Sequence, residues 1–245
     1  MIGASLIGAF LNALGILFGA LFGLAMRKPL TAQTQAFFKT ALGAFTVFWG
    51  LQLVYVDLHG TLTSRLKQIL IGILAVFLGY WLGKLLRLQT VSNRVGHHAA
   101  ALLAAAQKKP PGPPAAGFVA ATLLFCAAPL GILGAVADGL QSYFYLLLLK
   151  AVMDGLATMS FVKMFRWQVA LSALPVFFFF NGIALAVRLE FRPWLHAQGL
   201  ADSVGVANGL IVCSVALVIF EIRRVELANY LPALVIAPLL AHWFA

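Results

Sequence analysis

Charged residues are unusually scarce in this sequence. Of its 245 residues only 10% are charged, whereas about 25% are charged in an ordinary globular domain. So few charges cannot cover the surface of a soluble protein, and that class is excluded. The chain is instead 62% hydrophobic. It contains repeated runs of about 20 apolar residues, the length with which a helix crosses about 30 Å of hydrocarbon. We therefore expect an all-α integral membrane protein.

The residues of catalytic and metal sites are also scarce. Both cysteines, Cys126 and Cys213, fall inside apolar runs, where a small buried hydrophobe is their expected role. No His-Glu-x-x-His motif and no Gly-x-Ser-x-Gly turn occur. Three histidines stand alone near the predicted ends of spans: His59, His196 and His242. We therefore expect no metal site and no cofactor, and we expect the chain not to be an enzyme.

About eight spans are predicted, in one polytopic membrane domain that covers residues 1–245. The predicted spans are 2–26, 40–55, 68–86, 117–137, 143–162, 169–187, 204–222 and 227–244. The second span is short, and only a few residues separate the fourth from the fifth. Seven spans with one re-entrant segment is therefore the alternative.

Of the 17 Lys and Arg residues, all except Lys150, which lies inside a predicted span, lie in or beside the short segments between the apolar runs. The net charge of +10 therefore indicates contact with lipid headgroups and not with nucleic acid. Short cytoplasmic connections collect basic residues. Twelve of the 17 follow spans one, three, five and seven, and four lie on the opposite side. Both termini are therefore predicted to lie outside the cytoplasm.

The longest connection, residues 88–116, falls on the predicted cytoplasmic side. It contains the stretch HHAAALLAAAQKKPPGPP. The Ala/Leu run can form a short interfacial helix, and the proline cluster then predicts an extended linker into the fourth span.

Prolines interrupt two of the predicted spans. Pro129 lies in span four, close to Gly131, and Pro232 and Pro238 lie in span eight. Proline removes a backbone donor and clashes with the preceding turn, so both spans are expected to be broken or kinked. Membrane proteins that move solutes use such interrupted helices at their binding sites, although simple kinks are common too. Span two loosely resembles span seven, and an offset of five spans would make an internal repeat inverted. The two proline-containing spans, four and eight, are four spans apart, which would make it parallel. Both kinds of repeat therefore remain possible.

Span one carries four glycines near one helix face: Gly8, Gly15, Gly19 and Gly23. Such spacing lets another helix approach closely where lipid provides no hydrophobic driving force. The partner helix can lie in the same chain or in a second copy, and we expect a homo-oligomer, with a dimer as the simplest form.

The most unusual charges lie in a motif that occurs twice, Ala-Val-x-Asp-Gly-Leu, once with Asp138 and once with Asp154. Lys150 precedes Asp154 by one helical turn, so the two side chains share a face. A lone charge at the bilayer centre costs about 2.5 to 3.5 kcal/mol on insertion scales, which an opposite charge partly offsets. The pair either fixes how the helix docks or serves a function. Asp138 is expected near the outer interface, where a carboxylate costs little.

Three amides lie within predicted spans: Asn12, Asn181 and Asn208. They can line a polar path or make separate hydrogen bonds between helices.

Four stretches make the chain recognisable: FCAAPLGILGAVADGL, LLLKAVMDGLATMSF, LSALP and ANYLPALVIAPLL. In these the chain resembles the bacterial family of domain of unknown function 554, the YqgA-like inner-membrane proteins. The resemblance runs nearly end to end. It implies a multi-pass protein of the bacterial inner membrane, and it implies no reaction.

The leading hypothesis is a transport protein or channel for a small ion or polar solute. Its path would pass the break at Pro129 and Gly131 and the Lys150/Asp154 pair. Asp138 would lie at the outer mouth, and Asn12 and Asn181 would line the path. A non-catalytic scaffold or sensor subunit is one alternative, and a membrane-embedded enzyme is a second.

Overall fold

The computed structural model describes residues 7–26, 30–108 and 114–244, and in these ranges it contains helices and connections but no strand. The α-helices are α1 (Ile7–Ala25), α2 (Ala32–Val56), α3 (Leu62–Leu85), α4 (Leu88–Lys108), α5 (Pro114–Ala127), α6 (Pro129–Gln141), α7 (Tyr145–Phe165), α8 (Ala173–Ala186), α9 (Arg192–Ala197), α10 (Ala201–Ile219) and α11 (Ala233–Phe244). Two 3₁₀ turns, η1 (Arg166–Ser172) and η3 (Leu227–Tyr230), and a π-helical turn, η2 (Val187–Phe191), complete the order. The all-α prediction is confirmed.

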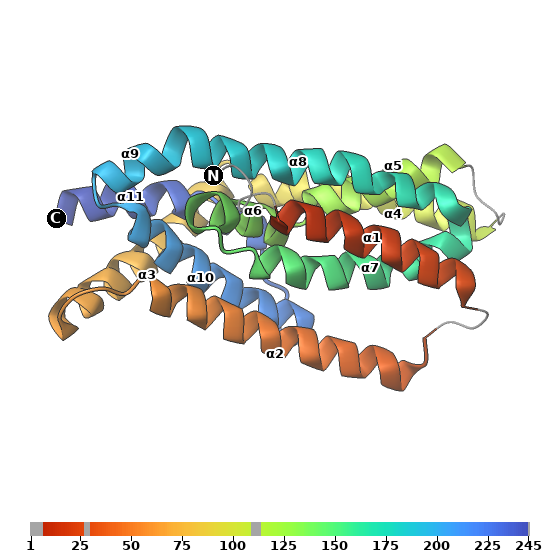
Figure 1. Ribbon diagram of the computed structural model, residues 1–245, viewed down its shortest axis with the longest axis horizontal. Helices are drawn as coiled ribbons and strands as arrows, with labels where there is room; N and C mark the ends of the chain where they lie inside the picture. Colours follow the sequence, from red (N-terminus) through yellow and green to blue (C-terminus); the bar gives the residue numbers. More distant parts are fainter. Residues whose placement is uncertain (1–6, 27–29, 109–113, 245) are drawn as a thin grey trace.

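Six helical stretches are long and apolar enough to cross a membrane, and α5 with α6 makes a seventh when this bent pair is taken as one span. The longest stretch, Tyr145–Ala197, has 53 residues. It is interrupted at Arg166, which ends α7 with a φ of 61°. Figure 1 shows that the chain turns back there, so that α8 runs against the direction of α7. Taken as two passes, this stretch brings the total into agreement with the eight predicted spans.

The predicted breaks in spans four and eight are present. α5 and α6 meet at an angle of 59° at Ala128, directly before Pro129. In span eight the 3₁₀ turn η3 ends at Tyr230, and the regular helix α11 begins at Ala233, after Pro232. Pro238 lies inside α11. Both interruptions follow from the missing amide and the ring clash of proline.

The two most extensive helix contacts join α1 with α7 and α2 with α10, and we refer to these as the two helix pairs. α8 lies over α1 and α6, whereas α3 packs on α10 and α11. The start of α2 and the start of α5 lie at one end of the bundle, on the right in Figure 1. The end of α2, α9 and the end of α11 lie at the other end, on the left in Figure 1. We refer to these as the Lys39 end and the Asp57 end.

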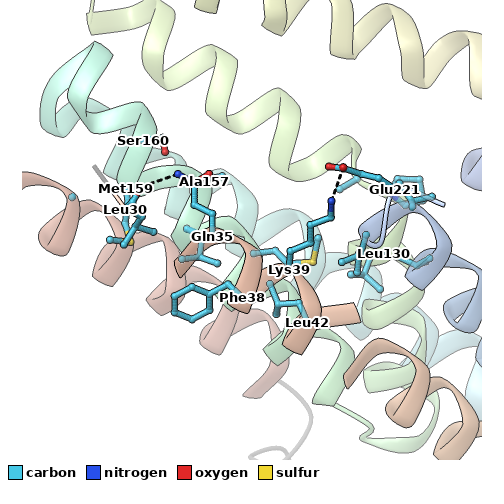
Figure 2. Close-up of a pocket in the computed structure, with 18 of the residues that line it drawn as sticks. Leu30, Gln35, Phe38, Lys39, Leu42, Leu130, Ala157, Met159, Ser160 and Glu221 are labelled. Atoms are coloured by element: carbon cyan, nitrogen blue, oxygen red, sulfur yellow. Dashed lines mark hydrogen bonds and ion pairs between the residues drawn. The ribbon is translucent and has the colours of Figure 1, made fainter. Parts of the chain in front are cut away.

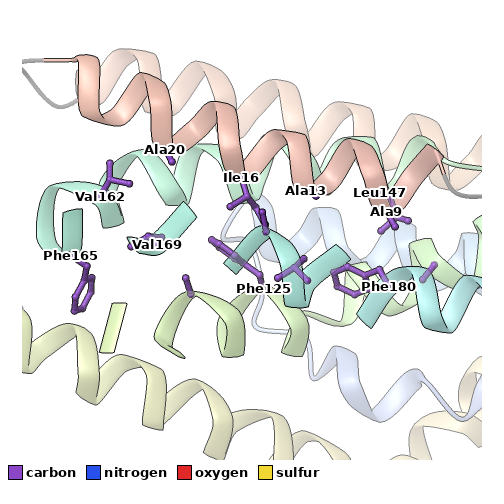
Figure 3. Packing of buried hydrophobic residues seen from close by; sticks show 14 residues of the cluster. Ala9, Ala13, Ile16, Ala20, Phe125, Leu147, Val162, Phe165, Val169 and Phe180 are labelled. Atoms are coloured by element: carbon purple, nitrogen blue, oxygen red, sulfur yellow. The ribbon is translucent and has the colours of Figure 1, made fainter. Parts of the chain in front are cut away.

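The largest buried cluster lies between α1, α5, α7 and α8 (Figure 3). α1 contributes mainly alanines to it, whereas the other helices contribute larger residues such as Phe125, Leu147 and Phe180. Large apolar side chains also cover the outside of the bundle. On α3, Leu70, Phe77 and Trp81 are each more than half exposed. An apolar exterior is what a protein surrounded by lipid presents, in agreement with a multi-pass membrane protein.

The connection 88–116 is more regular than predicted. The expected short interfacial helix is the 21-residue helix α4, which packs mainly on α5. The expected extended linker does not reach the fourth span, because Pro114 is already the first residue of α5. Proline fits the first turn of a helix, where its missing donor is not needed. The rest of the proline cluster lies outside the described residues.

The glycines of α1 face α7, so their partner helix lies within the chain. A Cβ atom at Gly15 would overlap the backbone of Ala151, and one at Gly19 would overlap Gly155. Gly23 lies against Met159 and Val162, and Gly8 lies against Leu147 and Asp138. Since the obstacles at Gly15 and Gly19 are backbone atoms, rotation of a side chain cannot relieve the overlap.

We predict that Gly19→Ala lowers the free energy of unfolding by about 1–3 kcal/mol, because the added methyl group forces α1 and α7 apart. The matched control is Gly182→Ala on α8, where a Cβ atom meets nothing within 4 Å. Thermal melting of the two purified variants in detergent checks this. Equal melting temperatures would contradict the account of the α1–α7 contact.

Candidate functional site

Lys150 and Asp154 form an ion pair within α7. The distance from Lys150 Nζ to Asp154 Oδ2 is 2.5 Å. The two residues are 2% and 6% exposed, so neither charge is in contact with bulk solvent. One helical turn separates them, which places both side chains on one face of the helix. The pair therefore neutralises itself where no water is available.

Two aromatic rings flank the lysine ammonium group. The ring centroids of Phe180 on α8 and Phe125 on α5 lie 5.3 and 5.7 Å from Lys150 Nζ. A cation above an aromatic face is attracted by the electron density of the ring. Gly131 on α6 closes the remaining side, since a Cβ atom there would overlap Lys150 Cε and the Phe180 ring. Four helices thus surround one charged group.

Asn12 on α1 faces the Asp154 carboxylate but is poorly paired there. It is completely buried, and it lies next to the acid. Its amide lies close enough to hydrogen-bond to the Asp154 carboxylate, but outside the usual limits of length or angle for such a bond. Buried polar atoms are nearly always paired in folded proteins, so the poorly paired amide of Asn12 is unusual.

The break between α5 and α6 adjoins the pair. Ala128 precedes α6 without a side-chain cap, and the Gly131 amide donates to the Ala128 carbonyl at 3.0 Å. A helix that is interrupted inside a bundle leaves backbone groups without their helical partners. Because Gly131 touches the lysine stem, the interruption and the ion pair belong to one site.

A pocket of about 760 Å³ opens at the Lys39 end, between the α1/α7 pair and the α2/α10 pair (Figure 2). Its walls are mostly apolar, with Phe38, Leu42 and Met153 among them, and it reaches Pro129 and Leu130 at the break. Its rim carries an ion pair in which Lys39 Nζ lies 2.5 Å from Glu221 Oε2. On the other side of the rim, Lys163 donates to the Met26 carbonyl.

The pocket stops short of the ion pair. Neither Lys150 nor Asp154 lines it, because α7 turns Met153, Leu156 and Ala157 toward the pocket instead. Leu130 lines the pocket and its neighbour Gly131 touches Lys150. The first turn of α6 therefore separates the pocket from the pair.

Asp138 was expected near the outer interface. It lies in the last turn of α6 and is completely buried, because α6 continues past it to Gln141 and α1 packs against it. Its Oδ2 atom accepts a hydrogen bond from the Gly8 amide at 3.2 Å. Its Oδ1 atom and the Nη1 atom of nearby Arg188 have no partner among the described residues.

The three amides do not converge. Asn208 on α10 donates a hydrogen bond to the Leu133 carbonyl of α6 at 3.0 Å. This is one of the separate interhelical hydrogen bonds that the sequence offered as the alternative to a polar path. Asn181 is half-buried on α8, and its amide oxygen has no partner in the described ranges. Of the three, Asn12 is the one that the structure brings to the ion pair.

Sequence reasoning missed Phe125 and Phe180, because phenylalanines in apolar runs carry no signal of their own. It also missed a buried carboxylate at the Asp57 end. Asp57 follows α2 directly and is 3% exposed, and its two oxygens both accept from Gln141 Nε2 at 2.7 Å. A side chain at position 205 would overlap this carboxylate, so Gly205 on α10 makes room for it.

The sequence is similar to those of known proteins along nearly its whole length. The model of the family described as "Protein of unknown function (DUF554)" matches residues 7–242. The chain belongs to this family. Among DUF554 relatives, the uncharacterized protein YqgA of Escherichia coli (strain K12) is 27% identical over 241 residues, 98% of each chain. The uncharacterized membrane protein YdfK of Bacillus subtilis (strain 168) is 24% identical over 231 residues, 94% of this chain and 93% of that protein. No solved structure matches the chain.

We predict that Lys150→Met lowers the free energy of unfolding by about 3–5 kcal/mol, because it leaves Asp154 buried without its partner. The double variant Lys150→Met/Asp154→Leu removes both charges at similar volume and recovers most of that loss. Melting curves of the wild type, of Lys150→Met, of Asp154→Leu and of the double variant give the coupling energy between the two side chains. Additive losses would contradict a direct pair.

We predict a pH-dependent loss of stability at the Asp57 end. Burial raises the pKa of Asp57 from 3.8 to about 7, against the opposing Gln141 hydrogen bond, with Asp202 adding to the rise and His59 reducing it. The folded protein keeps this proton up to about pH 7, whereas the unfolded chain releases it near pH 4. Stability from this group is therefore full below about pH 4 and falls as the pH rises to about 7.

Asp57→Asn tests this, because an amide cannot ionise and can pair with Gln141. The variant should lose less stability than the wild type between pH 5 and pH 8, measured as melting temperature in detergent. The same loss in both proteins would show that Asp57 is not the responsible group.

Proposed function

We propose that this DUF554 protein moves a small ion or polar solute across the membrane. The path runs from the pocket at the Lys39 end, past the break at Pro129, to the Lys150/Asp154 pair and on to Asp138. The observation that carries the proposal is a buried ion pair that adjoins a broken helix, whose first turn separates the pair from an open pocket. Transport proteins use interrupted helices at their binding sites because the free backbone groups can face a cavity.

The buried polar groups follow one face of α1. Gly8 binds Asp138, Asn12 faces Asp154, and Gly23 lines the pocket. At 1.5 Å per residue, Asn12 lies about 6 Å from Gly8 and about 16 Å from Gly23 along the helix axis. Between Asn12 and Gly23 the contacts of Gly15 and Gly19 with α7 close this face, so a path along it requires α1 and α7 to separate.

The Asp57 end is closed, which supports a carrier rather than an open channel. A buried cluster there contains Leu53, Leu133, Leu146 and Ile211. The hydroxyl of Tyr143 donates to the Trp49 carbonyl at 2.8 Å across the same region. Since one end is open and the other is packed, a solute can pass if the two helix pairs rearrange around the break.

This proposal places the protein in the bacterial inner membrane, with both termini outside the cytoplasm. The pocket then opens to the cytoplasm, because the Lys39 end has more basic residues and such residues collect on the cytoplasmic side. A homodimer stays a prediction. The glycines that suggested it now have another explanation, because Gly15 and Gly19 pack against α7 of the same chain.

A scaffold or sensor subunit is the second candidate. The observation in its favour is that the pocket does not touch Lys150 or Asp154, so the pair can be a sealed structural contact.

Flux assays in proteoliposomes separate the two. We predict that the wild type raises the uptake of at least one probe, among labelled sodium, rubidium, chloride and methylammonium, above that of protein-free vesicles. Asp154→Asn should reduce this uptake at least tenfold, because it removes the charge that binds the solute. Glu190→Gln, which changes an exposed carboxylate in the same way, should leave it unchanged.

If the wild type moves none of the four probes, the transport proposal is overturned in favour of the scaffold. If Asp154→Asn transports like the wild type, the path does not use the ion pair.

A further inference from the structure

The surroundings of Lys150 have the composition of a binding site for an ammonium group. The Nζ atom lies 2.5 Å from a carboxylate oxygen and faces two phenylalanine rings. A carboxylate together with aromatic faces is the arrangement with which proteins recognise organic ammonium ions. We call Asp154, Asn12, Phe125 and Phe180 the ammonium cage. Lys150 fills this cage with an ammonium group that is attached to the chain itself.

We propose that the ammonium cage is the solute site of this protein, that its solute is ammonium or a small primary alkylammonium ion, and that Lys150 occupies the site while no solute is bound. This inference rests on the proposed transport function and names the class of its solute.

The ligands of the cage favour an ammonium ion over a metal cation. Alkali and divalent cations are held by shells of oxygen atoms that replace their water. Asp154 and Asn12 contribute the side-chain oxygens of the cage, which are fewer than the roughly six to eight oxygens that a cation such as Ca²⁺ takes. The aromatic rings of Phe125 and Phe180 cannot replace the water of a strongly hydrated ion. An ammonium ion can donate hydrogen bonds to the two oxygens and lie against the rings.

Asn12 explains why the cage is incomplete with lysine. The lysine ammonium group is tied to its stem, whereas a free ammonium or alkylammonium ion can choose its own position. Lys150 donates to Asp154 and leaves the Asn12 amide oxygen without a partner. A free solute can take a position between Asp154 and Asn12 and donate to both. The buried amide is then satisfied when solute is bound.

The lysine also has a way out of the cage. Its Cε atom lies against Gly131, and the adjacent Leu130 lines the pocket. A movement of the first turn of α6, at the break before Pro129, would let the flexible stem leave and solute enter from the pocket. Lys150 and solute therefore exclude each other, and Lys150 keeps Asp154 neutralised whenever the cage holds no solute.

Thermal melting of Lys150→Met in detergent tests the cage without any flux measurement. The variant keeps an apolar stem and vacates the ammonium position. We expect methylammonium chloride and ammonium chloride to raise its melting temperature by a few degrees, in a saturable manner, because a ligand that binds only the folded state stabilises it. Sodium and potassium chloride at the same ionic strength should do much less.

The matched control is Lys150→Met/Asp154→Leu, in which the anion is gone, and it should not respond to methylammonium beyond its response to sodium. The wild type, in which solute must first displace Lys150, should respond only at higher methylammonium concentrations than Lys150→Met. An equal response of Lys150→Met to sodium, to potassium and to methylammonium, or no response to any of them, would overturn the ammonium assignment.

Flux distinguishes this failure from failure of the transport proposal. Wild-type proteoliposomes that take up rubidium or sodium in an Asp154-dependent manner, but not methylammonium, would keep transport and overturn the ammonium cage. If Lys150→Met cannot be purified in a folded form, competition decides: unlabelled ammonium, but not sodium, should reduce methylammonium uptake by the wild type. Equal competition by sodium would overturn the inference.

Discussion

The close approach of α1 and α7 is the contact on which the rest of this structure depends. Glycines at positions 15 and 19 allow the two backbones to touch, and they do so directly beside Asp154. A larger residue in either place would move α1 away, and Asn12 would no longer face the acid. The same contact excludes solvent from the ion pair. The arrangement therefore shows how the smallest residues in a membrane helix can decide the surroundings of its most polar ones.

The ion pair and the broken helix support each other. Inside a bundle the first turn of α6 has no preceding helical turn to bind its amides, and a regular helix from α5 through α6 would not present Gly131 to Lys150 in the same way. Burial of a paired charge rarely adds stability compared with an apolar replacement. An ion pair surrounded by Phe125, Phe180 and the poorly paired Asn12 is therefore the feature on which the proposed function depends.

Much of the fold could be predicted from the sequence. Apolar runs of sufficient length predict the spans, and proline predicts the breaks before Pro129 and at Pro232, because both effects are local. The contact between Lys150 and Asp154 was predictable for the same reason, since one helical turn determines it. The burial of Asp138 within the bundle was not, because it depends on how far α6 continues and on which helices cover it. Phe125 and Phe180 come from helices that are distant in sequence, and the sequence alone does not indicate which aromatic residues will meet.

The spacing of the ion pair also has a consequence for how the protein is made. Because Lys150 and Asp154 lie on one helix, they can neutralise each other as soon as that helix forms. A nascent segment with one unpaired charge near its centre would face a penalty of about 2.5–3.5 kcal/mol on entering lipid from the translocon. α7 can leave the insertion machinery as a nearly neutral unit, without waiting for another segment of the chain to supply the opposite charge.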